Sequence, residues 1–169
     1  MKFFEIEQKY RLKDPQSVRT LLKKAGARKI REGLEFNEFF DKGRFFRGQK
    51  VALRLRRHGN GQALLTLKGP RLRSRFTRRM EIETAVDYRS AKAMLEFLGC
   101  EPVMQYKKKR ESYRFGRALV TLDHLSRFGW FLEIETQPRE IARIAGKLGL
   151  RPEDREPRSY LNMLFQWKH

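Results

Sequence analysis

The chain has 169 residues, of which 40% are hydrophobic, and it carries a formal net charge of +19. That length and apolar fraction suit one globular domain, so we expect residues 1–169 to fold as a single unit. No run approaches the roughly 18 apolar residues of a membrane helix, and the single cysteine, Cys100, excludes a disulfide framework. The acidic N-terminus lacks the apolar region of a signal peptide, so we expect a cytoplasmic protein.

The excess of basic residues, 39 Lys and Arg against 20 Asp and Glu, predicts an anionic partner. Two interpretations remain open at this point. A solvated basic face that binds nucleic acid is the one favoured by composition alone. The other is a small polyphosphate ligand held by basic residues that point inward.

The first predicted element is a strand over residues 3–12, in which charged and largely apolar residues alternate. Asp14 and Pro15 then predict the start of a helix, because Asp is a good N-cap and Pro suits the first helical position. Apolar residues follow at helical spacing until Gly26, which predicts the end of that helix.

The tripeptide Glu-Ile-Glu occurs three times, at residues 5–7, 81–83 and 133–135. With 15 Glu and 6 Ile in the chain, chance predicts only about 0.05 occurrences. In an extended strand, residues i and i+2 point to the same face, so each copy projects two carboxylates to one side. Each copy precedes apolar residues at helical spacing that end at a glycine, which predicts three strand–helix units.

Two hairpins are predicted between these units. Residues 50–57 and 62–69 flank the turn sequence His58-Gly59-Asn60-Gly61. Residues 103–115 and 117–124 flank Gly116 in the same way.

Residues 71–79 are the densest basic stretch and predict a mobile loop rather than a strand, and residues 159–165 predict a short helix. No low-complexity linker divides the chain. Many antiparallel strands with a few helices indicate an α+β protein with a closed or highly curved sheet.

The charged residues of the predicted strands share faces. Arg54 and Arg56 alternate with leucines, and charged residues alternate with aliphatic ones in the same way along the other predicted strands. If the apolar faces pack outward against helices, the charged faces line one interior, where unpaired charges are costly. A metal cation would neutralise the acidic residues of such an interior, and a polyanion would neutralise the basic ones. A single such pair usually marks a solvated surface, but their conjunction favours a shared site. The sets that share a face are Glu5, Glu7 and Lys9; Thr66 and Lys68; Arg79, Glu81 and Glu83; and Lys108 and Arg110, while Asp123 alternates with Leu122 and His124.

With these motifs in order, the chain resembles the CYTH superfamily, the triphosphate tunnel metalloenzymes. Glu5-Ile6-Glu7-Gln8-Lys9 matches the ExExK signature of that family. The resemblance spans essentially the whole chain, and it is strongest to the branch of class IV adenylyl cyclases and thiamine triphosphatases. It implies a closed tunnel of eight antiparallel strands with helices packed outside. The other matching motifs are Ala52-Leu53-Arg54-Leu55-Arg56, Leu67-Lys68-Gly69, Arg79-Met80-Glu81-Ile82-Glu83, Lys108-Lys109-Arg110, Leu122-Asp123, Phe131-Leu132-Glu133-Ile134-Glu135 and Ser159-Tyr160-Leu161.

The resemblance also implies roles for individual residues. The implied ligands of a divalent metal, Mg²⁺ or Mn²⁺, are Glu5, Glu7 and Glu135, with Glu81, Asp123 and Glu133 as further partners. The implied triphosphate-binding residues are Lys9, Arg54, Arg56, Lys68, Arg79, Lys108 and Arg110. Lys9, Lys68 and Glu83 are the implied catalytic residues.

The expected function is therefore a metal-dependent reaction of a triphosphate or nucleoside triphosphate inside the tunnel. Hydrolysis by a triphosphatase is preferred because it needs fewer substrate-specific features, and the alternative is a class IV adenylyl cyclase that converts ATP to cyclic AMP and pyrophosphate. A basic nucleic-acid-binding or polyphosphate-binding module without catalysis is the rival from another class. No membrane partner is expected, and the sequence leaves the oligomeric state open.

One position departs from the family pattern. Phe39, in Asn37-Glu38-Phe39-Phe40-Asp41, stands where thiamine triphosphatases place a tyrosine linked to catalysis. A phenyl ring can neither donate nor accept that proton, which argues against thiamine triphosphatase activity.

Overall fold

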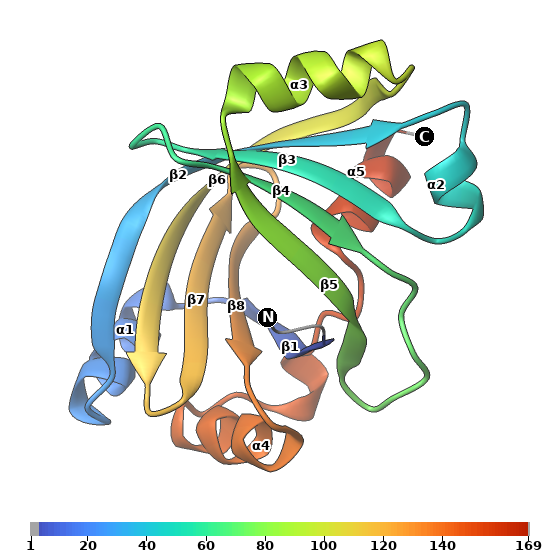
Figure 1. Ribbon diagram of the computed structural model, residues 1–169. Coiled ribbons are helices and arrows are strands. Elements are labelled where there is room, and N and C mark those ends of the chain that lie inside the picture. Colours follow the sequence, from blue (N-terminus) through green and yellow to red (C-terminus); the bar gives the residue numbers. More distant parts are fainter. Residues whose placement is uncertain (1–3, 169) are drawn as a thin grey trace.

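The computed structural model describes residues 4–168, and the sheet in it is closed. Eight antiparallel strands follow one another around a barrel in the order β1-β5-β4-β3-β2-β6-β7-β8 (Figure 1). The predicted α+β barrel is therefore confirmed, although Phe3 of the first predicted strand lies outside the described residues. The strands are β1 (Phe4–Leu12), β2 (Arg28–Asp41), β3 (Ala52–His58), β4 (Ala63–Lys68), β5 (Thr77–Val86), β6 (Glu101–Phe115), β7 (Ala118–Leu125) and β8 (Gly129–Glu135).

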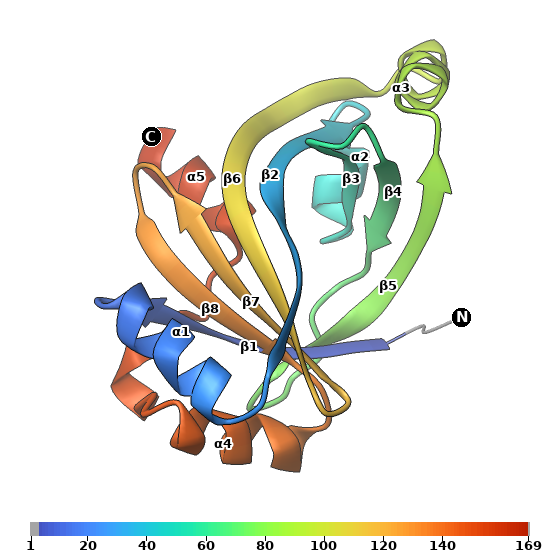
Figure 2. The ribbon, with the colours of Figure 1, turned by 90° about the vertical axis from the view of Figure 1, so that its left-hand side faces the viewer.

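Helices pack around the barrel and at one of its ends. Figure 2 shows α1 and α4 together on one side of the barrel, and α3 at the far end of β5 and β6. No helix within residues 4–168 has both the length and the apolar character needed to span a membrane. The helices are α1 (Pro15–Lys24), α2 (Phe45–Gly48), α3 (Tyr88–Phe97), α4 (Pro138–Lys147) and α5 (Tyr160–Lys168), with a 3₁₀ turn at Pro152–Asp154.

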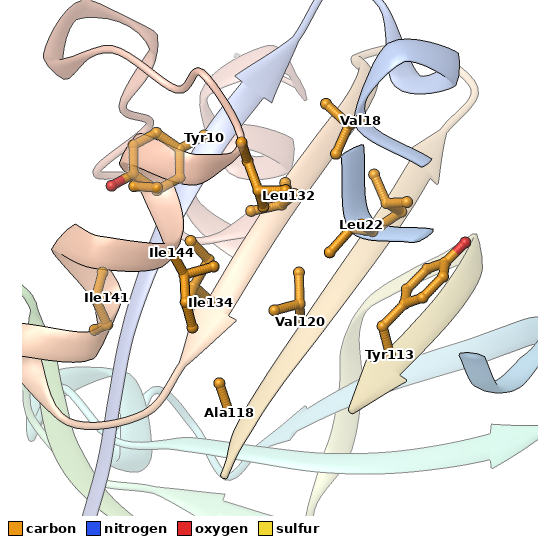
Figure 3. Close-up of a cluster of buried hydrophobic side chains, with 13 residues drawn as sticks. Tyr10, Val18, Leu22, Tyr113, Ala118, Val120, Leu132, Ile134, Ile141 and Ile144 are labelled. Atoms are coloured by element: carbon orange, nitrogen blue, oxygen red, sulfur yellow. The ribbon is translucent and has the colours of Figure 1, made fainter. Parts of the chain in front are cut away.

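The largest apolar core lies between α1, α4 and the outer faces of β1, β7 and β8 (Figure 3). Leu22 of α1 and Ile144 of α4 are fully buried there against Val120, Leu132 and Ile134 of the sheet. Burying each such side chain stabilises the fold by about 1.5–3 kcal/mol. Because alternate residues of a strand face opposite ways, packing this outer face fixes which residues of β7 and β8 face inward.

The N-terminal cap predicted at Asp14 is present, and Asp87 caps a second helix in the same way. Asp14 accepts hydrogen bonds from the backbone N–H groups of Gln16 (2.9 Å) and Ser17 (3.1 Å) at the start of α1. Asp87 accepts one from the N–H of Ser90 (2.8 Å) at the start of α3. These bonds satisfy N–H groups that the helix itself leaves unpaired.

Two local predictions need correction. The predicted loop 71–79 ends earlier, because β5 begins at Thr77 and pairs with β1 from there, with Arg79 opposite Glu5. The predicted strand 50–57 begins later, at Ala52, since Lys50 has a positive φ of 58° that interrupts an extended chain.

A long strand went unpredicted. β2 pairs with β6 along almost its whole length, yet its first half, Arg-Lys-Ile-Arg-Glu-Gly-Leu, is mostly polar, and even its Ile30 and Leu34 are exposed. Alternation identifies a strand only when one face is buried and the other is not. This segment therefore carries no such signal, and its partner strand fixes its conformation.

Glu111 of β6 ties α1 to the outside of the barrel. Its carboxylate accepts hydrogen bonds from Arg19 of α1 (Nη2 to Oε1, 2.7 Å) and from the hydroxyl of Tyr113 (2.8 Å), and the Lys29 Nζ lies 3.2 Å away. Burial acts to raise the pKa of Glu111, but these three partners outweigh it and lower the pKa to about 2. The ionised carboxylate therefore adds stability above pH 4.5, and this contribution is lost as the pH falls toward 2.

Replacing Glu111 by Gln should lower the free energy of unfolding by about 2 kcal/mol at pH 7. The difference in unfolding free energy between the variant and the wild type should shrink as the pH falls from 4.5 toward 2, because the wild-type carboxyl becomes protonated over this range. Urea unfolding across this pH range measures both effects. Glu140→Gln is the matched control, since the Glu140–Arg143 pair on α4 is 46% exposed on both sides and should change the stability little. A difference for Glu111→Gln that stays constant down to pH 2.5 would contradict this account.

Candidate active site

The inward-facing residues of the barrel line a cavity of about 530 Å³. Alternation along each strand turns the charged residues to this inner side and their aliphatic neighbours outward. Asp123 alone among the predicted site residues does not line the cavity, because its side chain is fully buried beneath Lys108 and Arg110. Those that do line it are Glu5, Glu7, Lys9, Arg54, Arg56, Lys68, Arg79, Glu81, Glu83, Lys108, Arg110, Glu133 and Glu135.

One wall of the cavity carries all three Glu-Ile-Glu pairs. The barrel order places β1 between β5 and β8, so the six carboxylates come from three adjacent strands. Glu7 lies directly opposite Glu135 in the β1–β8 register, and Glu5 lies opposite Arg79 in the β1–β5 register. Like charges directly opposite one another destabilise a sheet, so this wall favours the binding of a cation.

The carboxylates of this acidic wall are incompletely neutralised. Burial, followed by the charges of Glu5 and Glu133, raises the pKa of Glu7 to about 7, although Arg79 lies 3.5 Å away. Burial and the contact with Glu5 likewise raise the pKa of Glu81 to about 7, even though its Oε2 accepts from the Lys68 Nζ at 2.5 Å. Glu5 differs, because burial acts to raise its pKa but Lys68, the contact with Glu81 and Arg79 outweigh burial and lower it. The excess negative charge on this wall therefore lies at Glu7 and Glu81.

A divalent cation fits this wall by its chemistry. Its oxygen donors are carboxylates, which Mg²⁺ and Mn²⁺ prefer, although Lys9 of β1 and Arg79 of β5 lie among them. Within the described part of the chain, no three His, Cys, Asp or Glu side chains are gathered closely enough to hold a metal ion. The carboxylates turn instead toward neighbouring cations, as in the pairs of Glu5 with Lys68 (3.3 Å) and of Glu133 with Lys9 (3.8 Å).

The facing side of the cavity carries cations. β3 and β6 flank β2, which is the strand farthest from β1 in the barrel order. Arg54 and Arg56 come from β3, and Lys108 and Arg110 come from β6. Arg54, Arg56 and Lys108 are each less than a tenth exposed. A row of buried cations facing a wall of carboxylates makes the cavity electrostatically two-sided.

Glu83 lies where the two sides meet. Its Oε2 accepts hydrogen bonds from the Arg56 Nη2 (2.7 Å) and the Thr66 hydroxyl (2.8 Å). Burial acts to raise its pKa, but Arg56, Thr66 and Arg54 together lower it. A low pKa makes a carboxylate a weak base, so this geometry favours a role for Glu83 in positioning the two arginines over a role in proton transfer.

Asp123 anchors the cations of β6. It accepts hydrogen bonds from the Lys108 Nζ (2.9 Å), from Arg110 (Nε, 2.6 Å) and from the Tyr160 hydroxyl of α5 (2.9 Å). Burial acts against its charge, yet Arg110 and Lys108 lower the pKa of Asp123 to about 2. With its oxygens engaged by three donors, Asp123 holds the basic residues in place.

Glu35 of β2 is a site residue that sequence reasoning missed. It is 2% exposed, and its carboxylate lies 3.4 Å from the Lys108 Nζ, 3.7 Å from Arg56 and 3.9 Å from Arg110. Burial acts to raise its pKa, but these cations hold it far below its usual value. Glu35, Asn37 and Phe39 alternate along β2 and so share one of its faces. This period of two would have placed Glu35 with the other inward-facing residues if β2 had been recognised as a strand.

Three aromatic side chains, Phe39, Tyr106 and Tyr160, are among the residues that line the tunnel. Phe39 stacks on Tyr106 with ring centroids 6.1 Å apart, and the Lys9 Nζ lies 3.9 Å from the centroid of the Tyr160 ring. Burial raises the pKa values of Tyr106 and Tyr160 above their ordinary value, so both phenols stay neutral. Phe39 does line the tunnel, so the departure from the family pattern lies inside the site.

The comparison with family models places this site in a known group, since the CYTH domain model matches residues 4–160. The chain belongs to the CYTH family. The protein MJ0240 of Methanocaldococcus jannaschii is 30% identical over 139 residues, which cover 81% of this chain and 79% of that protein. Adenylate cyclase CyaB of Aeromonas hydrophila is 28% identical over 177 residues, which cover 96% and 90% of the two chains. The solved structure of a Vibrio parahaemolyticus protein has a TM-score of 0.87 at 30% identity and covers 98% of this chain and 99% of its own.

Glu35→Gln tests whether the cations of this CYTH tunnel need an internal counter-charge. The change leaves Lys108, Arg56 and Arg110 short of a buried anion, so the free energy of unfolding should fall by about 3 kcal/mol. Glu32→Gln on the same strand is the control, because Glu32 is 39% exposed and should change stability by less than about 0.5 kcal/mol. Denaturant unfolding at pH 7 measures both variants. Equal stability of the two variants would contradict the role assigned to Glu35.

Proposed function

We propose that this CYTH protein is a divalent-metal-dependent enzyme that acts on the triphosphate group of a small molecule bound in its tunnel. The observation that carries the proposal is the two-sided cavity, in which carboxylates of β5, β1 and β8 face cations of β3 and β6. A polyanion alone would be repelled by the first side, and a metal alone would leave the second side unneutralised. A metal–triphosphate complex satisfies both.

The carboxylates of Glu5, Glu7 and Glu135 would hold the metal, because adjacent strands bring their oxygen donors onto one wall, with Glu7 directly opposite Glu135. When bound, such a metal supplies Lewis-acid stabilisation to phosphate oxygens. Arg54, Arg56, Lys68, Arg79, Lys108 and Arg110 would hold the phosphates, with Lys9 beside them.

In the proposed hydrolysis, the oxygen of water forms a bond to the terminal phosphorus, and the bond from that phosphorus to the bridging oxygen breaks. The bridging oxygen leaves with the remaining diphosphate, and the proton of the water passes to solvent or to a carboxylate of the site. Charge then grows on the phosphate oxygens, so fixed arginines and lysines lower the barrier. The ion pairs that these cations make in the tunnel hold them in place before substrate arrives.

A second candidate reaction is cyclisation, which the similarity to adenylate cyclase CyaB of Aeromonas hydrophila favours. In that reaction the ribose 3′-oxygen of ATP forms the bond to the α-phosphorus, pyrophosphate leaves, and the hydroxyl proton is lost to a base. Both reactions use the same grip on the triphosphate. They differ only in the attacking oxygen and in the phosphorus that it reaches.

Product analysis separates the candidates. Wild-type protein should be incubated with ATP, inorganic triphosphate and thiamine triphosphate, each with Mg²⁺, with Mn²⁺ and with a chelator. We expect metal-dependent release of orthophosphate; cyclic AMP with pyrophosphate would identify the cyclase instead. Absence of turnover with every substrate and both metals would contradict the proposal and favour a binding protein for nucleic acid or polyphosphate.

Glu7→Gln tests the metal site. Metal-dependent turnover should fall about 100-fold or more, because a ligand is lost. The variant should also be no less stable than the wild type in metal-free buffer at pH 8. Burial and its acidic neighbours raise the pKa of Glu7 to about 7, so its charged form destabilises the fold at pH 8. Glu140→Gln, outside the tunnel, serves as the control, and full turnover by Glu7→Gln would overturn the assignment of this wall.

The basic segment that precedes β5 should steer the substrate. Arg71, Arg73 and Arg75 of this segment and Arg78 at the start of β5 are exposed, and the charges of Glu5 and Glu7 act on Arg71. Exposed charges act over about 10 Å at 0.1 M salt, and this reach shrinks as salt rises. The value of kcat/KM should therefore fall steeply between 20 and 300 mM salt (roughly the range over which screening sets in), while kcat changes little. A flat kcat/KM profile would reject steering.

A further inference from the structure

The positive charge of this protein lies outside the tunnel. The predicted site residues together with Glu35 comprise seven Lys and Arg and eight Asp and Glu, so as a set they are close to neutral. The formal net charge of +19 is therefore carried by the rest of the chain. A metal–triphosphate complex in the tunnel leaves these outer cations unexplained, and such an excess on a surface is typical of an anionic partner.

Many of the outer cations come from one stretch of the chain. Between Asp41 and Glu81 the sequence has no acidic residue, whereas its overall composition predicts about five in a stretch of this length. The same stretch has 13 Lys and Arg, of which four line the tunnel. Eight of the others are exposed and lie in residues 42–50 and 70–78, namely Lys42, Arg44, Arg47, Lys50, Arg71, Arg73, Arg75 and Arg78.

These two segments lie on the same side of the barrel. Figure 1 shows α2 and the connection between β4 and β5 on the side where α5 packs. Arg47 and Lys50 of the first segment and Arg71 of the second line one hollow beside α5. The two segments, residues 42–50 and 70–78, are called the basic rim below.

The basic rim is not neutralised by neighbouring carboxylates. Asp41 precedes it, but the oxygens of Asp41 accept hydrogen bonds from the backbone N–H groups of Lys42 (2.8 Å), Phe46 (2.9 Å) and Arg47 (3.2 Å). Elsewhere on the surface cations are paired, as Arg143 is with the Glu140 Oε2 at 2.7 Å. Within residues 4–168 the Lys and Arg side chains of the rim form no such pair. Their charge is therefore open to an external anion.

Two cations of the rim have an unusual backbone conformation. Arg44 and Lys50, on either side of α2, have φ values of 71° and 58°. Every other positive φ within residues 4–168 belongs to a glycine. This conformation suits glycine and is unfavourable for Arg and Lys. Cationic side chains at two positions where the backbone favours glycine indicate a role for their charge.

An aromatic ring is exposed among these cations. Phe45 is 58% exposed and packs edge-on against Phe46, with ring centroids 5.5 Å apart. Lys42, Arg44 and Phe45 line one hollow in the surface. Proteins bind single-stranded nucleic acid with such a combination, in which bases stack on rings and cations contact the phosphates.

We propose that the basic rim binds single-stranded nucleic acid on the outside of the barrel, with its cations on internal phosphates and Phe45 against a base. An anionic membrane surface fits this rim less well, because α2 has only four residues (Phe45–Gly48) and is too short to lie in a membrane interface as an amphipathic helix. This binding goes beyond the proposed function. It needs no triphosphate, because internal phosphodiesters stay outside the tunnel.

The test measures the affinity for a labelled strand of about 12 nucleotides that has a 5′-hydroxyl end, by fluorescence anisotropy in buffer with a chelator. An RNA strand and a DNA strand are both used, because they share the phosphates and bases that the rim would contact. Arg44→Gly/Lys50→Gly should weaken binding about tenfold, and the slope of log K against log salt should become shallower by about 1.4, since two phosphate contacts are lost. Glycine suits both positions, so the melting temperature should be no lower than that of the wild type. Phe45→Ala should weaken binding about tenfold with the slope unchanged, because a stacked base carries no charge.

Lys23→Gln/Lys24→Gln is the matched control, because it removes two exposed cations from α1, which Figure 1 shows away from α2. Its affinity should stay within about twofold of the wild type, since distant surface charges are screened. An equal loss in the two double variants would reduce the binding to net charge and overturn the role of the rim.

The remaining outcomes are equally decisive. Binding that requires a 5′-triphosphate end or a divalent metal would place the strand in the tunnel and contradict the proposal. It would also be refuted if neither strand binds, or if the protein binds only vesicles of phosphatidylcholine and phosphatidylserine. Turnover of small triphosphates is measured separately, so the proposed function stands or fails independently of these results.

Discussion

The structure depends on neutralising the charges that closure of the sheet forces inside. A barrel turns alternate residues of every strand inward, and in this chain those residues are largely Glu, Lys and Arg. Removing such charges from water without a partner costs several kcal/mol each. The outer apolar faces, packed against α1 and α4, contribute the free energy that makes this arrangement tolerable.

The carboxylates on the cationic side of the cavity are neutralised, whereas those on the acidic side are neutralised only in part. Around Asp123 and Glu35 every buried carboxylate has cationic neighbours and a depressed pKa. Along β1 the pKa of Glu7 is instead raised to about 7. Evolved proteins keep such unfavourable charge where function requires it. We therefore attribute the incompletely neutralised carboxylate on β1 to the proposed binding of a metal. We attribute the facing cations to the proposed binding of a polyanion.

The sequence was most informative where one face of a strand is apolar. The Glu-Ile-Glu strands and the Arg54 strand were predicted because their aliphatic neighbours reveal the period of two, and their inward faces followed from it. β2 gave no such signal in its polar half, so Glu35 was missed. The contact between Arg47 and Phe165 could not be predicted at all, because the two residues are distant in sequence and only the folded chain brings them together.

The most direct measurement of the central claim is anomalous X-ray scattering from Mn²⁺ in crystals grown with Mn²⁺ and inorganic triphosphate. The account predicts a manganese peak bounded by the carboxylates of Glu5, Glu7 and Glu135. It also predicts triphosphate density between that peak and the cations of β3 and β6. A manganese peak outside the tunnel, or triphosphate bound on the outer surface with the tunnel free of it, would contradict the account.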